Sequence, residues 1–188
     1  MLHVASFAGS LREGSYNRAL LRNAQVLAPD DMSLDILDIH EIPLYNADVE
    51  AEGDPPAVTS FREAVRAADG LLIATPEYNH GVPGVTKNVI DWASRPPRSS
   101  TLDEKPVALL GASPGMTGTA RGQSQLRQAF EFTNSFCMPQ PEVLVARAHE
   151  KFDDDGTLTH ERSREHLQKF LSAFTAWIRR VEPVADEE

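Results

Sequence analysis

Gly9-Ser10-Leu11-Arg12-Glu13-Gly14-Ser15-Tyr16-Asn17 is the stretch that says most about the fold, and we call it loop 1. It follows the apolar run from Leu2 to Phe7 and precedes a segment from Arg18 with apolar residues at helical spacing. Its two glycines permit tight backbone geometry. The free amides of a first helical turn, together with the positive end of the helix dipole, favour an anion. Loop 1 therefore predicts a strand, an anion-binding loop and a helix, in that order.

The side chains of loop 1 suit a single phosphate. Ser10, Ser15 and Asn17 supply donors, and Ser15 or Asn17 can also cap the helix. Arg12 would add a charge-assisted contact of about 1.5–3 kcal/mol. The sequence has neither the G-x-x-x-x-G-K-[ST] pattern of triphosphate loops nor the G-x-G-x-x-G pattern of dinucleotide sites. The alternative interpretation is a capped turn whose arginine faces solvent.

The rest of the chain alternates apolar runs with amphipathic stretches, which is typical of a parallel sheet covered by helices. We expect five strands and five helices, with a loop between Glu41 and Pro56. The run Leu71-Leu72-Ile73-Ala74 has no polar face, as expected of a central strand. The strands are expected at 2–7, 33–39, 71–74, 106–110 and 142–146, and the helices at 18–27, 58–68, 85–93, 120–132 and 167–181. This predicts one α/β domain over residues 1–181, followed by a disordered acidic tail at 182–188.

Two further unusual loops follow expected strands. Loop 2 is Thr75-Pro76-Glu77-Tyr78-Asn79-His80-Gly81-Val82-Pro83-Gly84, and loop 3 is Gly111-Ala112-Ser113-Pro114-Gly115-Met116-Thr117-Gly118. Doubly wound sheets bind ligands beyond the carboxyl ends of their strands. Three such loops, the first suited to a phosphate, predict a mononucleotide-shaped site.

Composition limits the possible partners. The chain of 188 residues has 28 acidic and 18 basic side chains and a net charge of −10, which argues against a nucleic-acid partner. Cys137 is the one cysteine, so no internal disulfide can form, and a reducing cytoplasmic setting is expected. No apolar run approaches the roughly 20 residues of a membrane span, so none is expected. The six histidines show no metal-ligand spacing, so we expect no metal.

Two stretches together resemble the NADPH-dependent FMN reductase family, which includes bacterial quinone, azo-dye and chromate reductases. They are Gly9-Ser-Leu-Arg-Glu-Gly-Ser-Tyr-Asn-Arg18 and Pro76-Glu-Tyr-Asn-His-Gly-Val-Pro-Gly-Val-Thr-Lys-Asn-Val-Ile-Asp-Trp92. The resemblance extends from about Leu2 to the last helix. It implies a flavodoxin-like fold, a three-layer sandwich around a parallel five-stranded sheet of order 2-1-3-4-5. It also implies a homodimer, which in this family often pairs into a homotetramer.

By position in these motifs, the resemblance assigns FMN contacts to ten residues. The phosphate would be held by Ser10, Arg12, Ser15, Tyr16 and Asn17. The isoalloxazine would be lined by Pro76, Glu77, Tyr78 and Asn79, with Ser113 near its edge. The helix from Val85 to Trp92 would face the partner subunit, and His80 receives no role.

The implied function is that of an FMN-dependent NAD(P)H oxidoreductase, with NADPH or NADH as co-substrate. Hydride transfer through flavin N5 would pass two electrons to a quinone or a related acceptor, such as an azo dye, chromate or free flavin. The cofactor carries this chemistry, so no side chain is expected to be catalytic. The preference for NADPH rests on the family alone.

Two other functions remain open at this point. The first is an electron carrier like flavodoxin, with no substrate of its own. The second is a serine hydrolase, because Gly111-Ala-Ser113-Pro-Gly115 matches G-x-S-x-G and Asp153 and His160 follow in a known order. Pro114 weakens the second, because it lacks the backbone N–H that an oxyanion hole needs at that position.

Overall fold

Parallel strands form the centre of the molecule, and all their pairings run in one direction. The computed structural model describes residues 1–97 and 99–181, so the expected acidic tail at 182–188 lies outside the described residues. The sheet order is β2-β1-β3-β4, and both β5 and β6 pair with β4. The strands are β1 Leu2–Ala8, β2 Met32–Ile36, β3 Gly70–Ala74, β4 Pro106–Ala112, β5 Phe136–Cys137 and β6 Val143–Val145. The predicted order 2-1-3-4-5 is confirmed, with the fifth position shared by two short strands.

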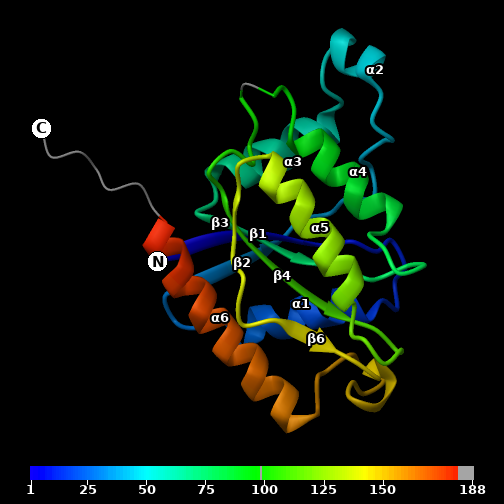
Figure 1. Ribbon diagram of the computed structural model, residues 1–188, viewed down its shortest axis with the longest axis vertical. Coiled ribbons are helices and arrows are strands. Elements are labelled where there is room, and N and C mark those ends of the chain that lie inside the picture. Colours follow the sequence, from blue (N-terminus) through cyan, green and yellow to red (C-terminus); the bar gives the residue numbers. More distant parts are fainter. Residues whose placement is uncertain (98, 182–188) are drawn as a thin grey trace, which may run out of the picture.

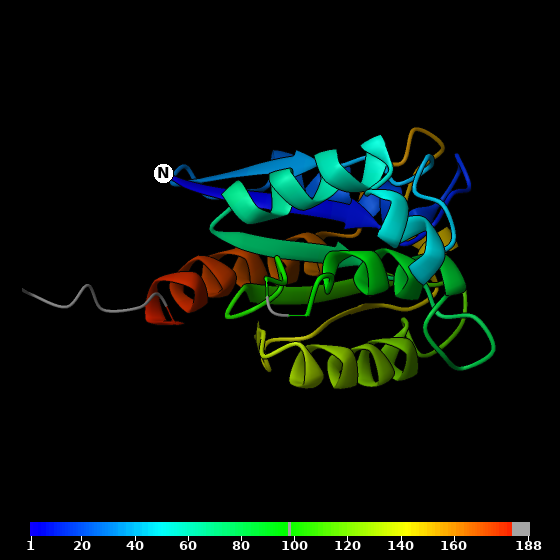
Figure 2. The same cartoon turned by 90° about the horizontal axis from the view of Figure 1, so that it is seen from above.

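Helices cover both faces of the sheet and complete a three-layer α/β sandwich (Figures 1 and 2). Helices α1 and α6 pack on one face, and α3, α4 and α5 pack on the other. The helices are α1 Tyr16–Val26, α2 Ala47–Glu52, α3 Pro56–Ala67, α4 Gly84–Ala93, α5 Ala120–Phe132 and α6 Glu161–Val181, with a short 3₁₀ helix η1 at Ala148–Glu150. Within residues 1–97 and 99–181, no helix combines the length and the apolarity that crossing a membrane requires.

Strand β3 separates the two halves of the core. Its five residues are all buried, as expected of a central strand. Leu72 packs into the cluster with α1 and α6, whereas Leu71 and Ile73 pack into the cluster with α3, α4 and α5. This alternation follows from the two-residue period of a strand. A continuous apolar run therefore fits a strand with helices on both of its faces.

The edge of the sheet differs from the sequence prediction. The expected strand at 142–146 is β6, but β5 precedes it and pairs with the first residues of β4. Between β5 and β6 the chain reads Met138-Pro139-Gln140-Pro141-Glu142. Proline has no N–H to donate to a ladder, so two prolines here interrupt the edge strand.

The expected loop at 41–56 contains a helix, α2, that the sequence did not predict. Asn46 caps α2 by accepting a 2.9 Å hydrogen bond from the amide of Asp48. No residue of α2 is buried, and the helix projects from the body of the protein (Figure 1). A helix that buries no face has no apolar periodicity, which is why the pattern did not reveal it.

Candidate functional site

The three loops meet beyond the carboxyl ends of β1, β3 and β4. They enclose a cavity of about 180 Å³ that contains side chains from each of them. The lining residues are Ser10, Arg12, Ser15, Tyr16, Asn17, Pro76, Glu77, Tyr78, Ala112, Ser113 and Pro114. Nine of the ten residues that the sequence singled out are therefore together, and Asn79 is the exception. The parallel register produces this grouping, because Ala8 pairs with Ala74 and Ala74 with Leu110.

Asn17 joins loop 1 to loop 3. Its buried side chain donates from Nδ2 to the carbonyl of Ala112 at 2.9 Å and accepts from the amide of Ala112 at Oδ1, also at 2.9 Å. This pair of bonds ties the first turn of α1 to the last residue of β4. Both ends of the Asn17 side-chain amide are thus bonded to the backbone of Ala112. The sequence did not reveal this pairing, because the two residues are 95 positions apart.

Two buried serines give loop 1 its donors. Ser15 is the N-cap of α1 and accepts a 3.2 Å hydrogen bond from the amide of Asn17. The hydroxyl of Ser10 accepts from the amide of Arg12 at 3.4 Å. Since both hydroxyl oxygens act as acceptors in these bonds, the hydroxyl hydrogens are available to an anion.

Backbone groups of loop 1 add to these donors. Within residues 1–97 and 99–181, the amides of Glu13, Gly14 and Tyr16 have no hydrogen-bond partner. Amides at a helix N-terminus bind an anion readily, and the helix dipole adds to that attraction. Loop 1 therefore has the donor set of a phosphate site.

The guanidinium of Arg12 folds back over Gly14. A Cβ at Gly14 would lie 3.2 Å from Arg12 Nη1, so a larger residue would crowd this side chain. In the described part of the chain, no carboxylate forms an ion pair with Arg12. Its charge is thus available at the mouth of the cavity.

Gly9 is required for space. A Cβ at Gly9 would lie 1.9 Å from the hydroxyl oxygen of Thr86, which is closer than any real contact. Neither Gly9 nor Gly14 has a positive φ, so the tight geometry expected of these glycines is a matter of close packing. Thr86 belongs to α4, so the close approach fixes loop 1 against the opposite face of the sheet.

Loop 2 contains a tight turn between Tyr78 and Gly81. Their backbones exchange two hydrogen bonds, at 3.1 and 3.0 Å. The two residues between them, Asn79 and His80, have φ values of 52° and 63°. Such a pair is the signature of a type I′ turn, in which asparagine is favoured. Asn79 is therefore exposed at the tip of the turn and outside the cavity, and Tyr78, which lines the cavity, is 54% exposed.

Glu77 lines the cavity but directs its carboxylate to helix α5. Its Oε2 accepts from the amide of Arg121 at 2.9 Å and from that of Gly122 at 3.1 Å. The N-cap residue of α5, Thr119, forms no side-chain cap. Glu77 therefore caps α5 from another loop, a role that only the tertiary structure reveals.

Ser113 is held by backbone contacts in loop 3. Its amide donates to the carbonyl of Val145 at 2.9 Å, and its hydroxyl accepts from the amide of Gly115 at 3.1 Å. The two hydrolase partners are engaged elsewhere. Asp153 accepts from the backbone of its own turn, and His160 Nδ1 lies 2.9 Å from the hydroxyl of Ser163. The described residues thus contain no Ser113–His160 bond, which removes the geometric basis of a serine hydrolase.

Cys137 does not take part in this site. Burial raises the pKa of its thiol to about 11, and the nearby charge of Arg127 only partly opposes this shift. The thiol is therefore protonated at neutral pH and is a poor nucleophile. Within residues 1–97 and 99–181, no cluster of three metal-ligating side chains occurs either.

Comparison with known proteins identifies the family. The sequence model for the NADPH-dependent FMN reductase family matches residues 2–150. An NAD(P)H-dependent FMN reductase of Pseudomonas aeruginosa is 51% identical over 96% of this chain and 97% of its own. A 2-hydroxy-1,4-benzoquinone reductase of a Burkholderia species is 41% identical over 95% of this chain and 97% of its own. Among solved structures, this chain is similar to FerB, an NAD(P)H:acceptor flavoenzyme of Paracoccus denitrificans. The two superpose with a TM-score of 0.88 and are 36% identical, over 96% of this chain and 98% of FerB.

The replacement Asn17→Ala should lower the free energy of unfolding by about 1–3 kcal/mol, because it leaves both backbone groups of Ala112 buried and unpaired. Urea denaturation followed by circular dichroism measures this change. Gln168→Ala on the exposed face of α6 is the control and should change stability by less than about 0.5 kcal/mol. Equal stability of the two variants would contradict the role assigned to Asn17.

Proposed function

This chain belongs to the NADPH-dependent FMN reductase family, and we propose that it passes electrons from NAD(P)H to quinones. The observation that carries the proposal is the single cavity in which loops 1, 2 and 3 meet. The quinone is suggested by the relatives named as quinone reductases, at 41–43% identity. The sequence resemblance extends the proposed acceptors to azo dyes, chromate and free flavin.

The phosphate of FMN fits loop 1. We assign it to the hydroxyls of Ser10 and Ser15, to the free amides of the first turn of α1, and to the charge of Arg12. The ring of Tyr16 packs against the ring of Phe152 at a centroid distance of 5.7 Å. This contact holds Tyr16 in place as one wall of the proposed phosphate site. Asn17 would act by holding loop 1 to loop 3, since both ends of its amide group bond Ala112.

The isoalloxazine ring fits the open side of the cavity. The enclosed volume of about 180 Å³ is below the roughly 300–1,000 Å³ of most ligand pockets, so it suits only one end of a mononucleotide. Pro76, Glu77, Tyr78 and Ser113 would border the ring, and Asn79 would reach it only from the tip of the turn. An exposed ring remains accessible to both NAD(P)H and a quinone.

When bound, FMN supplies the redox chemistry, accepting a hydride from NAD(P)H and returning two electrons to the acceptor. The role of the protein would be to bind FMN, to orient it and to leave one face of its ring open to NAD(P)H and the acceptor. Glu77, the acidic side chain in the cavity, is already bonded to α5, so it is not placed as a general acid or base. We therefore assign no catalytic side chain.

A homodimer is the assembly we propose, alone or paired into a homotetramer. A groove of about 480 Å³ runs between α4 and α5, and Phe132 at its end is 91% exposed. The part of α4 available to a partner is limited, because Val89 and Trp92 are fully buried within the chain. Lys87, Asp91 and Ser94 of α4 line the groove instead. An exposed phenylalanine beside an apolar groove suits an interface.

The cell compartment and the absence of a nucleic-acid partner are further parts of the proposal. We propose a cytoplasmic location, which the single, partly buried cysteine, Cys137, supports. The net charge of −10 argues against a nucleic-acid partner. Small molecules are then the expected partners: NADPH or NADH and the electron acceptor.

The purified protein should be yellow and should oxidise NAD(P)H when menadione is added, with no other protein present. Absorbance at the flavin and nicotinamide bands measures both properties. A colourless preparation that FMN cannot reconstitute would overturn the proposal. Flavin binding without direct NAD(P)H oxidation would instead indicate the electron carrier.

Replacing Arg12 by alanine should weaken FMN binding about ten- to a hundredfold, because one charge-assisted contact to the phosphate is lost. Quenching of FMN fluorescence gives the Kd. Arg180→Ala, at the far end of α6, removes the same charge and should leave the Kd unchanged. An unaltered Kd in Arg12→Ala, with a folded protein, would refute the assignment of loop 1.

The replacement Phe132→Asp should shift the protein from dimer towards monomer, because a charge would enter the proposed interface. Light scattering coupled to size exclusion measures the mass. Val26→Asp is the matched control, since Val26 is 81% exposed at the end of α1 on the opposite face of the sheet. A dimer that persists in Phe132→Asp would place the interface elsewhere.

A further inference from the structure

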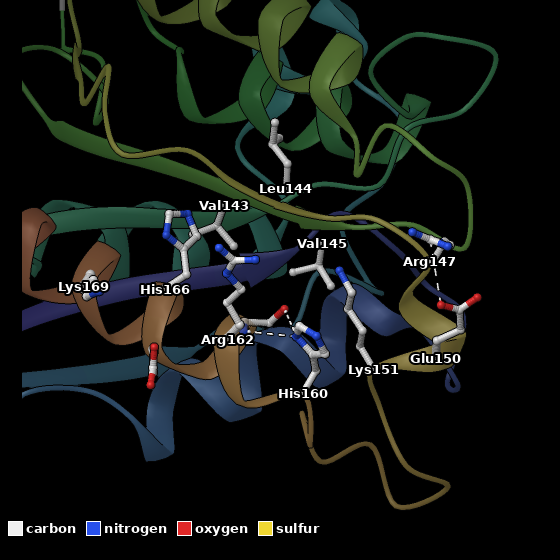
Figure 3. A pocket seen from close by; sticks show the side chains of 12 residues that line it. Val143, Leu144, Val145, Arg147, Glu150, Lys151, His160, Arg162, His166 and Lys169 are labelled. Atoms are coloured by element: carbon white, nitrogen blue, oxygen red, sulfur yellow. Dashed lines mark hydrogen bonds and ion pairs between the residues drawn. The ribbon is translucent and has the colours of Figure 1, made fainter.

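A second, larger cavity lies between β6 and the first half of α6, and Figure 3 shows it from close by. Its volume is about 750 Å³. Six of the twelve residues around it are basic: Arg147, Lys151, Arg162 and Lys169, with His160 and His166. None of the ten residues that the sequence singled out for FMN lines it, so it is distinct from the flavin site.

The charge of this cavity is opposite to that of the whole chain. Four of the 18 lysines and arginines line it, in a protein with a net charge of −10. Two acidic residues, Glu150 and Glu165, are also present, so an excess of two positive charges remains. One of these, Glu150, forms an ion pair with Arg147, with 3.8 Å between its Oε2 and Arg147 Nε. In the described part of the chain, Lys151, Arg162 and Lys169 have no ion-pair partner, so their charges are available to an anion.

Strand β6 lies behind the basic side chains of the cavity. Val143 and Val145 lie on the side of β6 that faces the cations, and Leu144 lies on the other side (Figure 3). Both valines are almost completely buried. Among the described residues β6 pairs only with β4, so it forms this edge of the sheet. A cavity of about 750 Å³ with several cations at its edge has room for an organic anion and not only for a bare ion.

The basic cavity adjoins the flavin site through loop 3. The amide of Arg147 donates to the carbonyl of Gly115 at 2.9 Å, and the amide of Ala148 donates to that of Ser113 at 3.0 Å. Ser113 lines the flavin cavity, whereas the side chain of Arg147 lines the basic one. The two cavities are therefore separated by one segment of backbone.

We propose that the basic cavity binds a nucleotide through a phosphomonoester group, independently of the FMN phosphate site. A dianionic phosphate matches the excess of two positive charges, and arginine binds phosphate oxygens in a bidentate manner. The cavity volume of about 750 Å³ leaves room for the organic part as well as for the phosphate. Two sources share this chemistry: the 2′-phosphate end of NADPH, which rests on the proposed function, and a separate nucleotide, which does not.

The test uses protein saturated with FMN, so that the loop 1 site is filled. Calorimetric titration with adenosine 2′,5′-bisphosphate should show binding that weakens as salt is raised, and adenosine should not bind. The double replacement Arg162→Gln/Lys169→Gln should weaken binding at least about tenfold, since it removes two charge-assisted contacts. Arg179→Gln/Arg180→Gln, at the other end of α6, removes the same charge and should bind as the unmodified protein does.

Steady-state kinetics distinguish the two sources. If the 2′-phosphate of NADPH occupies the cavity, the Arg162→Gln/Lys169→Gln variant should have a raised KM for NADPH and an unchanged KM for NADH. If both KM values are unchanged while bisphosphate binding is lost, a separate nucleotide is the ligand. Either result supports the site.

The proposal is overturned if FMN-saturated protein does not bind the bisphosphate, or if both double variants bind it equally. These outcomes are independent of the reductase function. FMN content and quinone reduction with NADH are measured on the same samples, and they report on loop 1 and the flavin alone.

Discussion

The pair of hydrogen bonds between Asn17 and Ala112 is the interaction on which the site depends. It joins the start of α1 to the end of β4, at 2.9 Å in both directions. The two bonds add a direct link between loops 1 and 3 to the packing of α1 against the sheet. A buried amide that satisfies both groups of one residue is costly to remove, so it defines one arrangement of the loops.

Several polar side chains at the carboxyl ends of the strands form hydrogen bonds to the backbone of the protein itself. Ser15 caps α1, Glu77 caps α5, and the hydroxyl of Ser113 closes its own turn. These bonds hold the loops in place without a bound molecule. What they leave unpaired, mainly the hydroxyl hydrogens and the amides of loop 1, is what an anionic ligand needs. Preorganisation of this kind lowers the entropic cost of binding.

Electrostatics in this protein act locally. The chain is strongly acidic, yet Arg12 and the residues around the basic cavity present positive charge at two neighbouring positions. Over distances of about a Debye length, salt screens the general negative field. Short-range contacts in the cavities are screened less, so a phosphate can bind to a protein of like net charge.

The sequence by itself determined the fold and, apart from Asn79, which of the singled-out residues line the cavity beyond β1, β3 and β4. Apolar runs separated by amphipathic stretches predicted the α/β sandwich, and loops 1, 2 and 3 predicted which residues gather. These features are local, because a strand, a helix start or a glycine-rich turn depends on neighbours in the chain. Helix α2 was not predicted, because it buries no residue and so has no apolar periodicity. A single edge strand was expected where the structure has β5 and β6, because the sequence pattern did not show where the pairing with β4 is interrupted.

Only the tertiary structure decided what each polar group bonds. The partners of Asn17 and Glu77 are 95 and 44 residues away, and no spacing in the sequence encodes such pairs. The basic cavity also depends on distant segments, because Arg147 and Lys169 line one cavity only when α6 packs beside β6. Local patterns fix which elements form, whereas the contacts between distant segments arise from packing.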